Sequence, residues 1–427
     1  MDQRLVSDER GCMHDHAFNF IADVPTVFHC HHFNLFWDQT VDDGLGQELG
    51  TVIRTNAARE SFHDLLSALA DRAGAHNATE RLELARVVAQ GLGMGTVRFD
   101  LDRYGGQALG DHLHHAIAWL EKYPSVRRRH PTDALTAGFV AAAAEVAFQL
   151  PRDSMRCREQ ECLTLGDARC RFRAELGEPA PATTPMRRSE VEQAAGPLVH
   201  SQLERDIQPI VDTLRDFTAS IRGDERGLVE AFGLFVSQLP TTYYNRIGYD
   251  ALRHLQRTAP QSVPVMQALM REAGHVCVFN TFGAIMASPE WEGLVGAPTG
   301  DTENTLAACM AIARALGMGR WCVTEYVHGQ RLVLRSPATY ESTYYPSREG
   351  RAEQSQCFMF QGAAVATMQL VARVQWQARP NFDQALYDEL FRGGMPWSCE
   401  ETQCVSKGDP TCEVVVTLRE GRSTFIA

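Results

Sequence analysis

The chain lacks several features that would place it in a common class at once. Its 427 residues contain no apolar run of about eighteen residues, the length that spans a bilayer, and the N-terminal Met1-Asp-Gln-Arg-Leu has no apolar signal stretch. We therefore expect no membrane partner and a cytoplasmic location. Thiols stay reduced in that compartment, so the twelve cysteines are expected to be free thiols or metal ligands and not disulfides.

Positive charge is also scarce. Lys and Arg number 41 against 53 Asp and Glu, which gives a formal charge of −12, and no long basic run occurs. Nucleic acids bind to basic surfaces, so we expect no nucleic-acid partner. The chain has no G-x4-G-K-[S/T] phosphate loop, no G-x-G-x-x-G and no Ser-His-Asp signature. These absences argue against a nucleotide-dependent or nucleophilic enzyme.

What the chain does contain is a cysteine motif that occurs twice. Both copies fit C-x-E-x2-C-x3-G-D-x2-C, and they lie about 240 residues apart. A coincidence at identical spacing indicates an internal duplication. The residues of the two copies are Cys157, Glu159, Cys162 and Cys170 in the first, and Cys399, Glu401, Cys404 and Cys412 in the second.

Three further pairs of landmarks extend the duplication along the chain. They are the segments that begin at Cys30 and Cys277, the glycine turns at Gly93–Gly95 and Gly317–Gly319, and the Tyr-Pro-Ser triplets at Tyr123 and Tyr345. We therefore divide the chain into three parts. Residues 1–176 form a first repeat, 177–224 a Pro-rich linker with a heptad-like helix, and 225–427 a second repeat with leading helices.

The hydrophobic pattern predicts an α+β fold for each repeat. Residues 24–36 are β-branched and aromatic, as in a strand, whereas 57–73 and 79–90 carry apolar residues at helical spacing. Residues 225–273 are predicted to be helical. Each cysteine motif is expected to close its repeat as a hairpin with Gly-Asp at the turn. The predicted architecture is two tandem repeats, each an antiparallel sheet with helices on one face.

The linker contains an apolar seam. Between Leu203 and Ile221 apolar residues step by four and three, which is typical of a helix that pairs with another. The seam predicts a homodimer, and the alternative is a helix that packs on its own domain.

The two motifs predict metal sites, because thiolates and carboxylates bind Zn²⁺. In a regular strand Glu159 and Cys162 would face opposite sides, and a bulge between them would bring both to one ion. The fourth ligand has two sets of candidates: Cys157 and Cys399, which share the strand face of the glutamate, or Cys30 and Cys277 from a neighbouring strand. The alternative is a buried thiol cluster without metal.

These motif residues carry a family resemblance. Glu-x2-Cys-x3-Gly-x3-Cys at the end of an α+β domain resembles the 4-vinyl-reductase (V4R) domain family, which includes ligand-sensing domains of bacterial activators that respond to aromatic hydrocarbons. The resemblance implies structural Zn²⁺ beside an apolar pocket. Carried over, the ligands are Glu159, Cys162 and Cys170 and their second-copy counterparts. The chain departs from the family in two ways. The upstream ligand position is not cysteine in either copy, and no Walker-type motif or evident helix-turn-helix follows Cys412, as would be expected of such an activator.

Histidine distinguishes the two repeats. It clusters in the first repeat, where imidazoles could hold iron, zinc or copper or act as general bases. The candidates for catalysis are His29, His31, His32, His112 and His115, with Cys30 and Asn34 as candidates for cofactor binding. His112 and His115 would lie one helical turn apart, which suits two ligands. The alternative is a set of surface imidazoles with one or two buried hydrogen-bonders.

Three functions are consistent with these patterns. The first is a sensor or carrier of a small, mostly apolar or aromatic molecule, with structural zinc. The second is a metalloenzyme whose Fe, Zn or Cu is held by the His/Cys cluster of the first repeat. The third is a haem- or tetrapyrrole-binding protein with His29, His31 or Cys30 as axial ligand.

Overall fold

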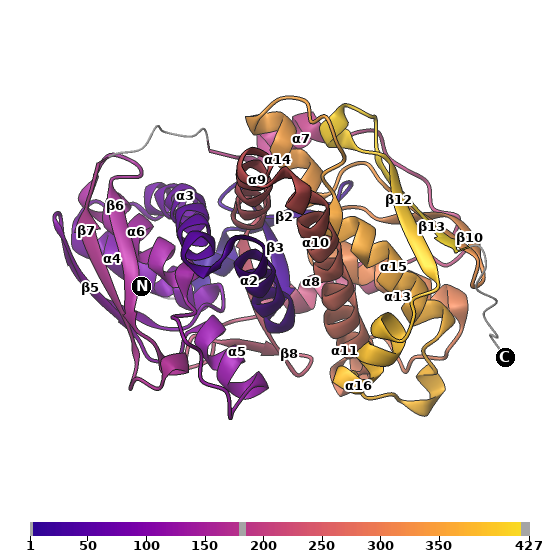
Figure 1. Cartoon of the computed structure of the whole chain (residues 1–427). Helices are drawn as coiled ribbons and strands as arrows, with labels where there is room; N and C mark the ends of the chain where they lie inside the picture. Colours follow the sequence, from indigo (N-terminus) through magenta and orange to yellow (C-terminus); the bar gives the residue numbers. More distant parts are fainter. Residues whose placement is uncertain (1–2, 179–184, 420–427) are drawn as a thin grey trace.

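A computed structural model describes residues 3–178 and 185–419 of the chain. Figure 1 shows two halves side by side, each with a sheet on its outer side and helices towards the centre. The Pro-rich stretch that the sequence predicts as a linker falls mainly on 179–184, outside the described residues.

The first half alternates helices with antiparallel hairpins. Its elements are α1 (Arg4–Asp8), β1 (Arg10–Met13), β2 (Phe18–Ile21), β3 (Val24–Cys30), α2 (His31–Leu45), α3 (Gln47–Ala73), α4 (Ala78–Gly91), β4 (Val97–Asp102), β5 (Gly105–Gly110), α5 (His114–Lys122), α6 (Ala134–Phe148), β6 (Met155–Glu161) and β7 (Cys170–Leu176). Helices α7 (Arg188–Ala194) and α8 (Gln208–Ser220) then lead into the second half.

The second half follows a similar order with additional short helices. Its elements are β8 (Val229–Ala231), β9 (Leu234–Pro240), α9 (Thr241–Thr258), α10 (Val263–Cys277), the π-helix η3 (Val278–Gly283), α11 (Ala284–Ala287), α12 (Pro289–Leu294), α13 (Thr302–Ala315), β10 (Cys322–Val327), β11 (Arg331–Ser336), α14 (Tyr340–Arg348), α15 (Phe358–Ala372), α16 (Gln384–Tyr387), the π-helix η5 (Asp388–Arg392), β12 (Trp397–Gln403) and β13 (Cys412–Leu418).

The sheets confirm the predicted α+β class. The first half has the strand order β4-β5-β7-β6 and the second half β10-β11-β13-β12, with all pairs antiparallel. A third, five-stranded sheet has the order β1-β2-β3-β9-β8. In that sheet β3 pairs with β9, so strands from both halves share one hydrogen-bonded ladder.

One glycine in each half lets the central helices approach closely. A Cβ on Gly138 in α6 would lie 2.3 Å from the carbonyl oxygen of Thr55 in α3. A Cβ on Gly362 in α15 would lie 1.8 Å from the carbonyl oxygen of Arg271 in α10. Both glycines are the fifth residue of their helix. The helix that precedes each cysteine hairpin is therefore fixed against its neighbour in the same way.

The glycine turns behave as matched landmarks. Gly93 and Gly95 have φ of 77° and 103°, and Gly317 and Gly319 have φ of 85° and 116°. This left-handed region favours glycine. Each turn carries the chain from a helix into the first strand of its four-stranded sheet.

Two predicted segments differ from the structure. The strand predicted for 24–36 ends at Cys30, because Phe33, Trp37 and Val41 recur at helical spacing and are buried as one face of α2. The helix predicted for 225–273 begins only at Thr241. Before it, β8 and β9 form a hairpin whose turn residues Phe232 and Gly233 both have positive φ.

The apolar seam of the linker lies inside the chain. Helix α8 begins at Gln208, with Pro209 in its first turn, where a missing N–H costs no hydrogen bond. Ile210, Val211 and Leu214 are buried, and α8 packs against α13. The seam is accounted for by packing within the chain.

Candidate metal centres and ligand groove

Both cysteine motifs form bulged hairpins. The register of β6 on β7 shifts between Glu159 and Glu161, and that of β12 on β13 shifts between Glu401 and Gln403. A bulge changes the alternation of side chains, so the glutamate and the cysteine three residues later face the same side. This confirms the bulge predicted from the sequence.

The turns of the two hairpins are also alike. Asp167 accepts a hydrogen bond from the backbone N–H of Cys162 at 2.8 Å, and Asp409 accepts one from Cys404 at 2.8 Å. The Gly-Asp pair of the motif therefore holds the first cysteine of each pair in place. The glycines of these turns have positive φ: Gly166 (99°) and Gly408 (86°).

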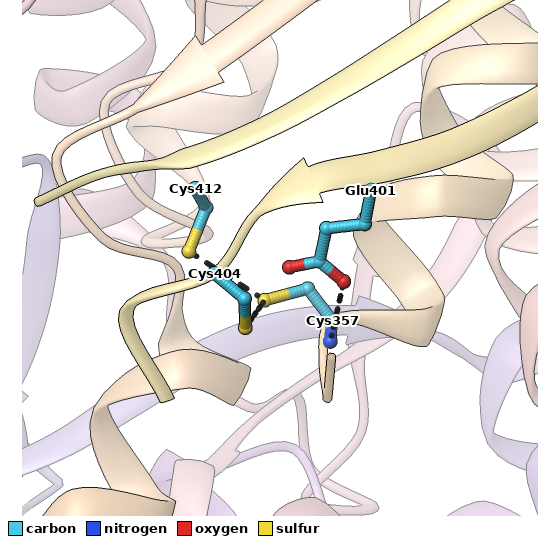
Figure 2. Close-up of side chains that lie close together, drawn as sticks. All are labelled: Cys357, Glu401, Cys404 and Cys412. Atoms are coloured by element: carbon cyan, nitrogen blue, oxygen red, sulfur yellow. Dashed lines mark hydrogen bonds between the residues drawn. The ribbon is translucent and has the colours of Figure 1, made fainter. Parts of the chain in front are cut away.

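The second hairpin completes a cluster of four possible ligands. Cys357, Glu401, Cys404 and Cys412 are all buried, and one ligand atom from each lies within 4.8 Å of all the others. The Sγ atom of Cys357 lies 3.7 Å from that of Cys404 and 3.6 Å from that of Cys412. Figure 2 shows these side chains converging between the hairpin and the residue before α15. Three sulfurs and a carboxylate form a donor set that suits Zn²⁺.

Local hydrogen bonds orient Glu401 in this cluster. Its Oε2 atom accepts from the backbone N–H of Cys357 at 3.2 Å and from Nε2 of Gln361 at 2.9 Å. Its Oε1 atom is buried and has no hydrogen-bond partner among the described residues. One carboxylate oxygen is thus fixed by the protein and the other is left for a further partner.

The first hairpin forms a cluster of three. Ligand atoms of Glu159, Cys162 and Cys170 lie within 4.8 Å of one another. The place of Cys357 is taken by Asp133, the residue before α6, whose backbone N–H donates to Glu159 Oε2 at 2.7 Å. Asp133 Oδ1 caps the helix by accepting from the N–H and O–H groups of Thr136 at 3.2 Å and 2.6 Å.

Burial and the neighbouring thiols shift the pKa values of both clusters. Burial, with a further contribution from the charge of Cys162 or Cys404, raises the pKa of Glu159 and of Glu401. A hydrogen bond from Cys170 lowers the pKa of Cys162 to about 4. Against the opposing effect of burial, hydrogen bonds from neighbouring thiols lower the pKa of Cys412. Buried charge without a counter-ion is costly, and a divalent cation in each cluster would offset part of the negative charge of its thiolates and carboxylate.

The predicted fourth ligands lie elsewhere. Cys157 and Cys399 are half-buried and do not belong to either group of possible ligands found among the described residues. In the second copy it is Cys357, which the sequence analysis did not consider, that joins the hairpin residues in a group that could hold a metal ion.

Cys30 and Cys277 are not equivalent positions. Cys30 ends β3, whereas Cys277 ends α10. Thr281 donates a hydrogen bond to Cys30 Sγ at 3.0 Å, and Cys277 Sγ lies 3.6 Å from His29 Nδ1. Both cysteines are buried, each contacts the other half, and neither belongs to the groups of possible metal ligands found among the described residues.

The predicted histidines do not converge on one metal position among the described residues. His29 is fully buried and stacks on Phe33, and burial lowers its pKa to about 3. His31 Nδ1 accepts from the N–H of Phe235 at 3.2 Å. His32 Nδ1 lies 3.3 Å from Lys122 Nζ.

The remaining candidates of this set have separate surroundings. His112 is exposed and precedes α5, so the predicted helical pairing of His112 with His115 is wrong. His115 is buried, with Nε2 3.7 Å from Asp38 Oδ2. Asn34 joins the halves: it donates to Ser237 at 3.0 Å and accepts from Tyr244 at 2.7 Å.

A groove of about 500 Å³ lies beside the first cluster. It runs between the start of α3, the start of α6 and the edge strand β6, and Glu159 is part of its wall. Apolar lining comes from Val52, Ala134 and Ala137, and Cys157 faces the groove as well. Its basic lining residues are Arg59, His130, Arg156 and Arg158.

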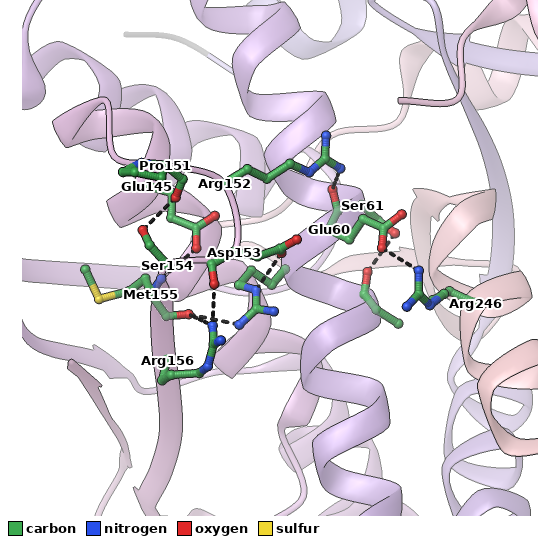
Figure 3. A network of polar contacts seen from close by, with 12 residues as sticks. Glu60, Ser61, Glu145, Pro151, Arg152, Asp153, Ser154, Met155, Arg156 and Arg246 are labelled. Atoms are coloured by element: carbon green, nitrogen blue, oxygen red, sulfur yellow. Dashed lines mark hydrogen bonds and ion pairs between the residues drawn. The ribbon is translucent and has the colours of Figure 1, made fainter. Parts of the chain in front are cut away.

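A polar network fixes the β6 wall of this groove (Figure 3). Arg59 donates to Asp153 Oδ1 at 2.9 Å and to the carbonyl of Met155 at 3.0 Å. The Met155 N–H donates to Glu145 at the end of α6. Glu60, one residue beyond Arg59, accepts from Arg246 of the second half at 2.8 Å. The groove wall is therefore tied to both α3 and the neighbouring half.

Comparisons with known proteins give little further information. No protein-family model matches the chain, and no curated protein matches it. Among solved structures the chain is similar to the phenol-responsive sensory domain of the transcription activator PoxR with phenol. The TM-score is 0.34 and the identity 15%, over 41% of this chain and 88% of that domain. This similarity is too low to assign a fold or a function.

Among residues 3–178 and 185–419, none of the helices combines the length and the apolar character needed to cross a bilayer.

Proposed function

We propose that the chain is a metal-containing protein that binds a small molecule, as a sensor or carrier. It consists of two V4R-like copies, residues 1–176 and 225–427, joined by the segment 177–224. The observation that carries the proposal is the buried set Cys357, Glu401, Cys404 and Cys412, whose ligand atoms lie within 4.8 Å of one another.

Zinc is the metal that this donor set suits best. Zn²⁺ prefers sulfur and nitrogen ligands and accepts a carboxylate, and a closed set of four is typical of a structural site. Cys357, Glu401, Cys404 and Cys412 would hold one ion, and Glu159, Cys162 and Cys170 would take part in holding a second. The metal would replace the protons that the thiols and glutamates otherwise keep.

The groove of about 500 Å³ is the proposed ligand site. Its volume is in the range of pockets that take small organic molecules. Apolar side chains line it together with a few basic groups, so a small, mostly apolar or aromatic molecule with one polar group would fit. The molecule would bind beside the first metal, because Glu159 belongs to both the groove and the cluster.

The cellular setting and the assembly state belong to the same proposal. None of the twelve cysteines, all of which lie in the described part of the chain, forms a disulfide. Reduced cysteines are typical of the cytoplasm, and we place the protein there. The homodimer remains a prediction. It requires a surface other than the α8 seam, whose central residues are buried against α13.

Metal analysis of the purified chain, with an absorption spectrum, tests the proposal. We expect about two zinc ions per chain, no Soret band, and thermal stabilisation by at least one member of a set of small phenols and aromatic acids. Iron or copper in place of zinc would favour the metalloenzyme, and a Soret band the haem protein. A chain that takes up no metal after reconstitution would rule the proposal out.

A further inference from the structure

The two clusters share one framework and differ at one position. Asp133 and Cys357 both directly precede a helix, and both donate a backbone N–H to Oε2 of the cluster glutamate. The hairpin that follows has the same bulge and the same Asp-to-cysteine hydrogen bond in each half. Because the frame is the same, the change from Cys to Asp alters the ligand set and not the fold.

Asp133 does not take over the role of Cys357. Its carboxylate lies outside the group of ligand atoms that approach one another within 4.8 Å. Its Oδ1 atom is committed to capping α6 through Thr136. Its Oδ2 atom is buried and has no hydrogen-bond partner among the described residues. The first cluster is thus one protein ligand short, with an unpaired polar atom nearby.

The two clusters also differ in what lies beside them. Glu159 of the first cluster lines the groove, although its Oε1 atom is buried, whereas all four members of the second cluster are buried. Closed four-ligand sites are typical of structural zinc, and sites that keep an open position are typical of zinc that binds an outside ligand. The first site has fewer protein ligands, and one of them, Glu159, borders the groove.

We propose that the metal of the first cluster, held by Glu159, Cys162 and Cys170, keeps one coordination position for a donor atom of the molecule bound in the groove. This inference rests on the proposed function and specifies its ligand. The donor is an anionic oxygen or sulfur, as in a carboxylate, phenolate or thiolate. On the groove wall Arg156 and Arg158 outnumber Glu48, the carboxylate there that is not a proposed metal ligand, and so favour negative charge; Arg59 is already paired with Asp153.

Cobalt substitution tests this in the full-length chain. The protein is loaded with two equivalents of Co²⁺, whose visible spectrum reports coordination, and titrated with azide and with benzoate as probes. We expect the spectrum to change with saturation at one of the two ions. In the zinc form, release to a chelator should be biphasic, with one ion leaving at least tenfold faster than the other.

Two exchanges of the differing residue make the test specific. Asp133→Cys should abolish the probe response and slow the fast ion to the rate of the second site. Cys357→Asp should create a second fast ion. Asp133→Asn retains a capping oxygen and should behave like the wild type. Circular dichroism checks that each variant is folded.

Several results would overturn the inference. If Asp133→Asn loses the first metal, Asp133 itself is the fourth ligand and the site is closed. If the wild type holds two ions that leave at one rate and ignore both probes, the sites are equivalent, while the proposed function survives. If the wild type binds no metal, both proposals fail.

Discussion

The two halves of the molecule pack a helix against a hairpin in the same way but differ in the side chains that surround the hairpin cysteines. Each places a helix, closely packed through one glycine, before a bulged hairpin that carries Glu and two Cys. The second half adds Cys357 and buries a complete set, whereas the first has Asp133 and a groove beside the site. The comparison teaches that the same frame forms with either Asp133 or Cys357 before the helix, so the residue at that position can change without a change of the frame.

Loss of a hairpin cysteine should give the largest difference between the halves. Cys404→Ala removes a ligand from the closed set and should lose one metal with a destabilisation of about 5 kcal/mol or more, since structural zinc contributes folding free energy directly. Cys162→Ala should cost less, because the first site has fewer ligands to lose. Urea unfolding with metal analysis measures both. An equal or larger loss for Cys162→Ala would contradict the distinction between the sites.

The helix contacts offer a second comparison. Gly362→Ala and Gly138→Ala each force a Cβ against a backbone oxygen, at 1.8 Å and 2.3 Å. Overpacking typically costs about 1–3 kcal/mol, and we expect values at the upper end, with Gly362→Ala the more damaging. Gly293→Ala in α12 is the matched control, because nothing lies within 4 Å of its added Cβ. Thermal unfolding of the three variants measures the effect, and equal midpoints would contradict it.

The contact between the halves should respond to acid through His29. Burial lowers its folded pKa to about 3 from 6.5, so the unfolded chain binds the extra proton between these values. The contribution of this neutral histidine to the free energy of unfolding is fully present above pH 6.5 and is lost as the pH falls towards 3. At pH 5 the loss is about 2 kcal/mol.

The His29→Phe variant tests this dependence. It should show a smaller fall in unfolding free energy between pH 7.5 and pH 5 than the wild type. His112→Phe, at an exposed position, should leave the fall unchanged. If His29→Phe follows the wild-type pH profile, the ring is not a buried neutral group.

The half-buried cysteines should give the smallest effect. Cys157→Ser and Cys399→Ser change residues outside both groups of possible ligands. We expect the metal content to be unchanged and the stability to stay within about 0.5 kcal/mol of wild type. Loss of one metal from either variant would restore these residues as fourth ligands.

Most of the correct predictions came from short-range patterns of residues in the sequence. The hairpins, the bulge between Glu159 and Cys162 and the α+β class depend on neighbouring residues, so spacing alone indicates them. The helix at α2 was missed because its buried positions Phe33, Trp37 and Val41 are β-favouring aromatic and β-branched residues. Their spacing of four was the better guide.

The place of Cys357 in the second cluster was missed for a different reason. Cys357 lies 44 residues before Glu401, whereas Asp133 lies 26 before Glu159, so the two spacings do not match. The second half inserts α16 and η5 between the helix and its hairpin. Aligning the two small-residue helices on Gly138 and Gly362 would have set Cys357 opposite Asp133. The burial of the cluster side chains and the distances between them depend on the fold, so they could not be obtained from the spacing of residues in the sequence.

The hydrogen-bonded pairing of β3 with β9 has a consequence for how the sequence of this molecule can evolve. In a symmetric dimer of identical subunits, every substitution occurs twice, so a ligand given up at one site is given up at both. Here the two strands that meet belong to one polypeptide, and each codon is used once. Substitutions can therefore change the cluster of one half while the other half keeps its own. The β3–β9 pairing that connects the two halves is not affected.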